Sequence, residues 1–163
     1  ERTGLPAAIV YSIIKSESAF MADARSPAGA MGLMQLLPAT AQETARRIGR
    51  KLVRPEDLYD PSLNVSLGAA YLKHMLDHYE GNLAMAAAAY NAGPGRVRAW
   101  RPATGCMDAE RWMELVPFRE TRRYVRQAFF NATVYQWRLA LPTLRIEDRL
   151  APVPPRHTRA ATC

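Results

Sequence analysis

Cysteine is scarce in this 163-residue chain, and long apolar runs are missing. Its two cysteines, Cys106 and Cys163, are too few for a disulfide-rich scaffold or a zinc site. No run of about 18 apolar residues occurs, so no membrane-spanning segment is expected. Strand-like alternation does not persist beyond a few positions, and no internal repeat is visible. Since 48% of the residues are hydrophobic and can fill a core, the expected fold class is an all-α globular domain.

Acidic and aromatic residues are also sparse, and both shortages indicate what kind of molecule the chain binds. The formal net charge of +7 favours a polyanion: nucleic acid, an anionic membrane or an acidic polymer. Aromatic residues make up only 9% of the chain and do not alternate with lysines, and no DNA-reading motif is present. We therefore do not expect a nucleic-acid partner. A polymer that carries carboxylates fits the charge equally well.

Histidine is limited to three residues, which bears on metal binding. His74 and His78 are four residues apart on a predicted helix, a spacing that can bind zinc. Met75 stands where the zinc-protease motif requires glutamate, and the third histidine, His157, lies near the C-terminus. We interpret the pair as a solvated helix face and expect no metal site and no cofactor.

Proline and glycine divide the chain into segments with helical periodicity. Asn82 and Asp108 are expected to cap the helices that follow them, and residues 91–95 to form a sharp turn. An ordered loop is expected over 22–35, and a connector with one short helical turn over 51–61. The first expected helix begins at Pro6, runs through Glu17 and ends before Asp23, and the second runs from Pro38 to Gly49. Two more are expected over about 62–80 and 83–90, and a short one follows the turn and ends at Trp100. The last two run from Asp108 to Leu115 and over about 119–139.

The helical pattern fills residues 1–141, which we predict to be one folded domain. Residues 142–163 form a proline-rich basic segment, expected to be an extended or partly disordered tail. The chain opens with Glu1 and shows no signal-peptide pattern, so a mature form or an excised domain is expected.

Glu17 stands in line with the apolar face of the first predicted helix. Ile9, Ile13 and Phe20 share its stripe, and this face should pack into a core. Most such glutamates reach water at the edge or pair with an arginine. The alternative is a general acid, because burial keeps a carboxyl group protonated near neutral pH. Three polar residues can orient such a group: Ser18, Ser26 and Gln35.

Two further stretches are unusual for surface connections. Residues 26–35 combine glycines with Leu33 and Met34, which indicates either a packed connector or the wall of a groove where a sugar lies against the main chain. Residues 89–93 place Tyr90 and Asn91 at the end of a helix, next to a turn. That arrangement is consistent with packing or with ligand binding.

Four motifs in order give the chain a family resemblance. They are Glu17-Ser18, residues 32–35 followed by 38–41, residues 89–97, and residues 120–125. In this order and with these gaps, the chain resembles the soluble-type lytic transglycosylases, the goose-lysozyme-like murein-cleaving enzymes, over about residues 5–137. The resemblance implies a lysozyme-like helical fold with a glycan-binding groove and makes residues 1–141 the catalytic domain. It also implies cleavage of the β-1,4 bond between N-acetylmuramic acid (MurNAc) and N-acetylglucosamine (GlcNAc), leaving a 1,6-anhydro-muramic end.

The resemblance assigns roles residue by residue. Glu17 matches the catalytic acid, which would act first as acid and then as base while the substrate's N-acetyl group stabilises the cation. Most glycosidases need a second carboxylate, but Asp23 is the only acid near Glu17 in the sequence. Met31 and Leu37 are small departures from the family pattern. The implied substrate-binding residues are Ser26, Gln35, Tyr90, Asn91, Glu120 and Tyr124.

The resemblance further implies peptidoglycan strands as the partner and a location in the periplasm or cell envelope. We also expect the chain to be a monomer. Two alternatives stay open. One is a goose-lysozyme-type hydrolase, which uses water as acceptor, and the other is a glycan-binding module that has lost catalysis.

A disulfide bond between Cys106 and Cys163 is a hypothesis at this stage. The family acts outside the cytoplasm, where disulfides persist, and the extended tail is long enough to reach Cys106. The alternative is two unrelated thiols, because closing so long a loop lowers the chain entropy.

Overall fold

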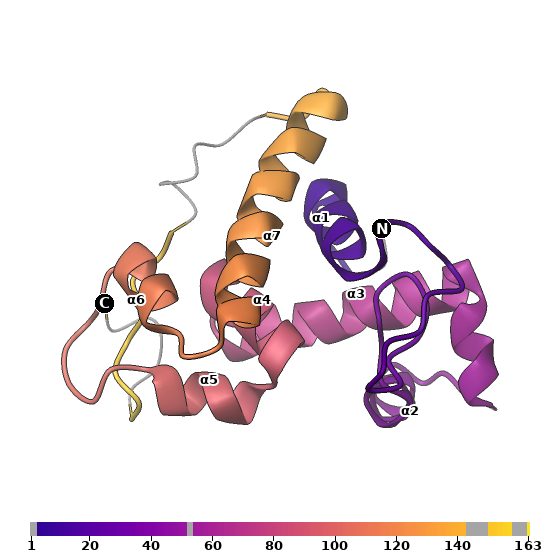
Figure 1. The fold of residues 1–163 in the computed structure, drawn as a ribbon, viewed down its shortest axis with the longest axis horizontal. Coiled ribbons are helices and arrows are strands. Elements are labelled where there is room, and N and C mark those ends of the chain that lie inside the picture. Colours follow the sequence, from indigo (N-terminus) through magenta and orange to yellow (C-terminus); the bar gives the residue numbers. More distant parts are fainter. Residues whose placement is uncertain (1–2, 52–53, 143–149, 158–162) are drawn as a thin grey trace.

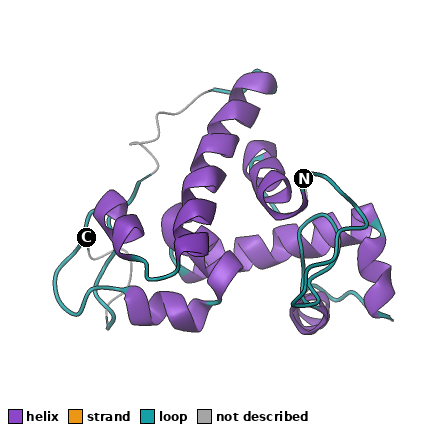
Figure 2. Cartoon of the chain, viewed as in Figure 1, coloured by secondary structure: helices purple, strands orange, loops and turns teal. Residues whose placement is uncertain are grey.

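The computed structural model describes residues 3–51, 54–142, 150–157 and 163 (Figure 1). Within that part of the chain it is helical, with isolated β-bridges and no strands, as Figure 2 shows. The predicted all-α class is therefore confirmed. The elements are α1 Ala7–Ser18, α2 Pro38–Arg47, the 3-10 helix η1 Pro55–Tyr59, α3 Pro61–His78, α4 Leu83–Ala92, α5 Pro94–Trp100, α6 Ala109–Leu115 and α7 Arg119–Arg138.

Helix starts follow the local chemistry of the sequence, with one exception. Pro38, Pro61 and Pro94 each occupy a first helical position, where a missing N–H leaves no hydrogen bond unmade. Asn82 caps α4 as predicted, because its side chain accepts a 3.0 Å hydrogen bond from the Met85 N–H. Asp108 precedes α6, but its side chain makes no capping hydrogen bond, so that predicted cap is wrong.

The turn between α4 and α5 is tighter than predicted. Instead of a turn over residues 91–95, α4 continues through Ala92 and α5 begins at Pro94. Gly93 alone makes the corner, with a φ of +89° that side-chain-bearing residues rarely adopt. This corner joins two helices that both contribute to the pocket described below.

The core is organised around the alanine-rich helix α4. All residues from Leu83 to Tyr90 are buried, because α3, α5 and α7 pack around this helix. Alanine side chains let these neighbours approach closely. Helix α1 lies beside the long helix α7 (Figure 1).

The apolar face of α1 is shorter than the sequence predicted. Ile13 and Ile14 are buried, whereas Phe20 is 43% exposed. Helix α1 ends at Ser18, and Ala19 and Phe20 both adopt left-handed backbone conformations, with φ of 51° and 69°. The chain therefore leaves the helix axis immediately after Glu17 and Ser18, and Phe20 does not continue the buried stripe.

A fully buried asparagine holds the loop between α1 and α2. Asn64, on α3, donates hydrogen bonds of 2.9 and 2.8 Å to the carbonyls of Met31 and Leu58, and accepts one of 2.8 Å from the Met34 N–H. Gly32 lies so close that a Cβ atom there would approach Asn64 to 2.3 Å. The loop is thus an ordered wall, which agrees with the prediction for residues 22–35.

The described part of the tail, residues 150–157, is extended and packs against the segment between α5 and α6. Met107 and Val153 exchange two backbone hydrogen bonds of 2.9 and 2.7 Å, and Val153 is fully buried. The Arg101 guanidinium donates to the carbonyls of Pro154 and Pro155, at 3.0 and 2.6 Å. Of the tail predicted as extended or partly disordered, this stretch is therefore extended and firmly packed. Residues 143–149 and 158–162 lie outside the described residues.

The hypothesised bridge between Cys106 and Cys163 is present as a disulfide bond. It closes across 57 residues of sequence and ties the C-terminal residue to the loop before α6. These are the two cysteines of the chain, so neither is a free thiol.

Candidate active site

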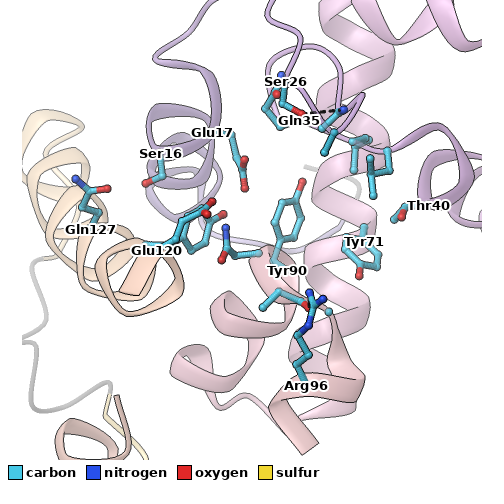
Figure 3. A pocket seen from close by; sticks show the side chains of 18 of the residues that line it. Ser16, Glu17, Ser26, Gln35, Thr40, Tyr71, Tyr90, Arg96, Glu120 and Gln127 are labelled. Atoms are coloured by element: carbon cyan, nitrogen blue, oxygen red, sulfur yellow. Dashed lines mark hydrogen bonds between the residues drawn. The ribbon is translucent and has the colours of Figure 1, made fainter. Parts of the chain in front are cut away.

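A pocket of about 720 Å³ opens where α1, the loop before α2, α3, the α4–α5 corner and α7 meet. Figure 3 shows side chains from these separate elements pointing into the same space. The seven residues to which the family resemblance assigns a role all line this pocket: Glu17, Ser26, Gln35, Tyr90, Asn91, Glu120 and Tyr124. Residues more than 100 positions apart in the sequence are thus brought together in one groove.

Glu17 is held at the pocket edge by the way in which α1 ends. It is the second-to-last residue of the helix, and the next residue, Ser18, donates a 2.8 Å hydrogen bond to the Leu33 carbonyl of the loop. Ser18 thereby fastens the helix end to the loop wall, rather than acting on the carboxyl group itself. The consecutive left-handed residues Ala19 and Phe20 turn the chain away and leave the Glu17 side chain directed into the pocket (Figure 3).

The environment of Glu17 raises the pKa of its carboxyl group to about 7. Burial is the main cause, because a low-dielectric surround disfavours the charged form. The nearby Tyr124 hydroxyl opposes this shift in the pKa, because a donor favours the charged carboxylate, and the negative charge of Glu120 adds to the shift. The side chain keeps partial access to the pocket. A proton carried near neutral pH can therefore be passed to a bound molecule.

The Tyr124 hydroxyl group is buried and has no hydrogen-bond partner of ordinary geometry among the described residues. It interacts with Glu17 nonetheless, since it lowers the pKa of that carboxyl group. A donor at this position favours the anionic form of Glu17 over the protonated form. Burial also keeps the pKa of Tyr124 well above its usual value, so the phenol remains a donor.

Tyr90 joins α4 to the loop wall. Its hydroxyl donates a 2.8 Å hydrogen bond to the Met34 carbonyl, and burial raises the pKa of the phenol well above its usual value. Its ring contacts the Tyr71 ring of α3, with centroids 5.2 Å apart. Tyr90 remains protonated, so its oxygen has lone pairs left to accept a hydrogen bond from a ligand.

Ser26 and Gln35 line the opposite wall and are held by the backbone of their own loop. The Ser26 hydroxyl oxygen accepts a 3.0 Å hydrogen bond from the Ala30 N–H. The Gln35 amide donates to the carbonyls of Ala24 and Gly32, at 3.0 and 2.9 Å, and its φ is +47°. These bonds leave the serine hydroxyl free to donate and the glutamine side-chain oxygen free to accept. The sequence analysis expected both residues to orient Glu17 directly, whereas the hydrogen bonds described here go to the loop.

Asn91 and Glu120 complete the set from the far side of the pocket. The Asn91 side-chain oxygen accepts a 2.7 Å hydrogen bond from the Thr121 hydroxyl, so its amide N–H groups are the ones left for a ligand. Glu120, in the first turn of α7, is exposed. Its charge is close enough to Glu17 to raise the pKa of that carboxyl group. Glu120 therefore brings a second carboxylate near Glu17 in the fold, although the two residues are far apart in the sequence.

The sequence analysis did not select four of the larger polar side chains that line the pocket. Arg123 and Gln127 follow Glu120 by three and seven residues, so helical periodicity on α7 could have identified them. Tyr71 comes from α3 and carries no local signal in the sequence. These four pocket residues are Tyr71, Arg96, Arg123 and Gln127.

The two histidines at zinc-binding spacing lie elsewhere. His74 Nε2 is 3.2 Å from an Arg47 guanidinium nitrogen, and the His78 ring packs edge-on against Tyr79. Among the residues that the structure describes, no group of three or more histidine, cysteine, aspartate or glutamate side chains could hold a metal ion.

No described helix has both the length and the apolarity to cross a bilayer.

Known proteins resemble this chain in sequence. The soluble lytic murein transglycosylase of Escherichia coli (strain K12) is 37% identical over 135 residues, which are 82% of this chain and 21% of that protein. The soluble lytic murein transglycosylase of Salmonella typhimurium (strain LT2) is 39% identical over 127 residues, 77% of this chain and 20% of the relative. The chain spans about a fifth of the length of these relatives.

Solved structures and a family match agree with this similarity. An inactive mutant of lytic transglycosylase Slt from Pseudomonas aeruginosa superposes with a TM-score of 0.85 at 43% identity, over 91% of this chain and 25% of that one. The 70-kDa soluble lytic transglycosylase of Escherichia coli gives a TM-score of 0.82 at 33% identity, over 91% of this chain and 25% of its own. Residues 1–113 match the family described as the transglycosylase SLT domain. The chain therefore belongs to the transglycosylase SLT domain family, and its fold is that of the lytic transglycosylases.

Proposed function

We propose that this chain is the catalytic domain of a murein lytic transglycosylase, which cleaves the β-1,4 bond between MurNAc and GlcNAc and leaves a 1,6-anhydro-MurNAc end. The observation that carries the proposal is Glu17, a carboxyl group that opens into a pocket and whose pKa is raised to about 7. The relatives named as soluble lytic murein transglycosylases support the choice of peptidoglycan as substrate.

In the first step, protonated Glu17 gives its proton to the glycosidic oxygen as the bond from that oxygen to C1 of MurNAc breaks. GlcNAc leaves as an alcohol, and C1 becomes electron-poor. The carbonyl oxygen of the substrate's own N-acetyl group then bonds to C1, so no enzyme nucleophile is needed. General acid catalysis of this kind contributes about 10²- to 10⁴-fold.

In the second step, Glu17 acts as the base. Its carboxylate takes the proton of the C6 hydroxyl group as O6 attacks C1 and displaces the N-acetyl oxygen. The proton balance closes, because Glu17 ends as it began and no water is consumed. Between the two steps Glu17 is a carboxylate, and Tyr124 stabilises this form, since its hydroxyl lowers the pKa of the Glu17 carboxyl group.

The polar residues of the wall suit an N-acetyl group and neighbouring hydroxyls. Ser26 and Asn91 have donors left after their protein hydrogen bonds, while Gln35 and Tyr90 have acceptors left. An amide presents one N–H and one carbonyl, and it therefore needs one partner of each kind. We assign these four residues to substrate binding and positioning.

A hydrolase of the goose-lysozyme type is the second candidate, and Glu120 is the observation that favours it. Inverting glycosidases place a second carboxylate about 6.5–9.5 Å from the acid to activate water. Glu120 lines the same pocket, and its negative charge raises the pKa of the Glu17 carboxyl group. In our preferred mechanism its charge instead helps to keep Glu17 protonated before substrate arrives.

Product masses distinguish the two reactions. Purified sacculi are digested with the chain, and the released muropeptides are analysed by mass spectrometry. The transglycosylase gives anhydro ends that are lighter by one water than the reducing ends of a hydrolase. A third possibility, a binding module without catalysis, would release no dye from labelled sacculi.

We place the site of action in the cell envelope, where the proposed substrate lies. The disulfide bond between Cys106 and Cys163 is consistent with an oxidising compartment. We further propose that the domain acts as a monomer without a metal or an organic cofactor, since the mechanism uses only side chains and the substrate's own groups.

A further inference from the structure

Arg96 is held in place at the pocket by two contacts. One guanidinium nitrogen donates a 3.1 Å hydrogen bond to the Ala92 carbonyl at the end of α4. The guanidinium carbon lies 5.2 Å from the centre of the Phe118 ring, which in turn packs edge-on against Trp100 at 5.3 Å. Such a cation–π contact orients the planar guanidinium group. Figure 3 shows the side chain pointing from α5 toward the pocket floor near Tyr71 and Tyr90.

This ordered cation has no carboxylate partner among the described residues. The ion pairs found there involve Arg47, Arg54, Lys73 and Arg126, all outside the pocket. A guanidinium group has five N–H donors, and Ala92 accepts only one of the bonds that Arg96 can make. The remaining donors lie at the pocket that Arg96 lines, and their planar fork geometry matches a carboxylate.

The other charges of the pocket permit an anion to bind. Arg96 and Arg123 are positive, Glu120 is negative, and Glu17 is neutral while it carries its proton. The lining therefore has one net positive charge before the reaction begins. Glu120 weakens the attraction for an anion but does not outweigh two arginines.

We infer that Arg96 forms an anion subsite of the pocket and binds a carboxylate of the substrate. This inference rests on the proposed function, which supplies a polymer with carboxylates at regular intervals. The carboxylate has two possible sources: the peptide stem, or the lactyl group of MurNAc where the stem has been removed. Both present the same planar anion to the guanidinium group. The subsite makes substrate charge, in addition to sugar identity, a determinant of binding.

The test measures binding without turnover, in the Glu17→Gln protein. Dissociation constants are determined for three probes: glycan strands with intact stems, strands denuded by an amidase so that lactyl carboxylates remain, and denuded strands whose lactyl groups have been converted to neutral amides. Each probe is titrated against Glu17→Gln alone and with Arg96→Gln added. Arg98→Gln is the matched control, because Arg98 is exposed on the same helix and does not line the pocket.

Arg96→Gln is expected to weaken binding about three- to tenfold for a carboxylate-bearing probe, and to leave binding of the neutral probe unchanged. A loss only with intact stems identifies the stem carboxylate, and a loss only with denuded strands identifies the lactyl carboxylate. A loss with both charged probes shows that the subsite accepts either carboxylate. Unchanged binding of every probe, an equal loss for all three, or an equal loss in Arg98→Gln would overturn the subsite. If the parent chain turns over no strand at all, the proposed function fails, and that outcome is visible separately in the dye-release assay.

Discussion

The buried hydroxyl group of Tyr124 lies close enough to Glu17 to lower the pKa of that carboxyl group, yet it forms no hydrogen bond of ordinary geometry among the described residues. A buried hydroxyl without a partner is unfavourable to folding. Its position is understandable if the partner is the Glu17 carboxylate, which exists only after the proton has left. Burial and Tyr124 act on the pKa of Glu17 in opposite directions, and the result is an acid near neutrality.

Replacing Glu17 by glutamine should abolish turnover of peptidoglycan. Glutamine keeps the size of the side chain but can neither give nor take the proton in either step, so a loss of at least about 10⁴-fold is expected. The measurement is dye release from labelled sacculi, with circular dichroism and strand binding as controls for the fold. Activity within tenfold of the parent chain would exclude Glu17 as the acid.

The same substitution should change how stability depends on pH. The pKa of Glu17 is about 7 in the folded chain and 4.5 in the reference state, so the folded state binds the proton more tightly. The contribution of protonated Glu17 to the free energy of unfolding is therefore fully present below about pH 4.5, and it is lost as the pH rises through 7. Glu17→Gln should therefore match the parent at pH 4 and exceed its unfolding free energy at pH 8, by up to about 3 kcal/mol.

Urea denaturation of both proteins at the two pH values measures this difference. Taking the difference between parent and variant cancels the other titrating groups. Equal stability of the two proteins at pH 8 would show that Glu17 is not held protonated by burial.

Tyr124→Phe should slow turnover and shift the pH profile. Removing the hydroxyl removes the group that lowers the pKa of Glu17, so the alkaline limb of kcat/KM should move to higher pH. Stability should be unchanged or raised, because a buried unpartnered hydroxyl is deleted. Tyr135→Phe is the control, since Tyr135 lies on the same helix and packs against Tyr11 and Phe20 outside the pocket. An unshifted alkaline limb would contradict the contact with Glu17.

Local sequence signals were sufficient to predict most helices. Proline at a first helical position and Asn82 as a cap act within a few residues of the helix that they start, so they can be identified without the fold. The burial of Phe20 was mispredicted, because periodicity alone does not show that two left-handed residues end α1. The packing of the tail depends on the pairing of Met107 with Val153, which no local pattern specifies.

Some of the pocket residues could likewise be predicted from local sequence, whereas others depend on tertiary packing. Glu17 and Tyr90 belong to motifs that could be matched to a family, and their neighbours in the sequence explain their placement. The effect of Glu120 on Glu17 and the contribution of Tyr71 arise only when α1, α3 and α7 meet. Such relationships depend on tertiary packing, so a single sequence without a fold cannot provide them.

Gln35→Ala and Tyr90→Phe test whether the pocket wall serves binding or packing. Tyr90→Phe removes one hydrogen bond to Met34, worth about 1 kcal/mol, and Gln35→Ala removes two bonds within the loop. We expect turnover to fall by more than tenfold in each case, while the thermal midpoint changes only modestly. Steady-state rates and melting curves are compared on the same preparations. A large fall in midpoint with unchanged activity per folded molecule would favour a packing role.

The disulfide bond between Cys106 and Cys163 should stabilise the domain without affecting catalysis. It links residues 57 apart in sequence, and chain-entropy arguments give about 4 kcal/mol as the upper end for a loop of that length. Neither cysteine lines the pocket, so the double substitution Cys106→Ser and Cys163→Ser should keep parental kcat and KM at low temperature.

Denaturation of parent and double variant with and without a reductant measures the effect. The reductant should lower the stability of the parent toward that of the variant and leave the variant unchanged. The hydrogen bonds from Arg101 to Pro154 and Pro155 hold the tail independently of the bridge, so part of the packing should survive reduction. A parent whose stability is insensitive to the reductant, with two free thiols after denaturation, would show that the bond is absent in solution.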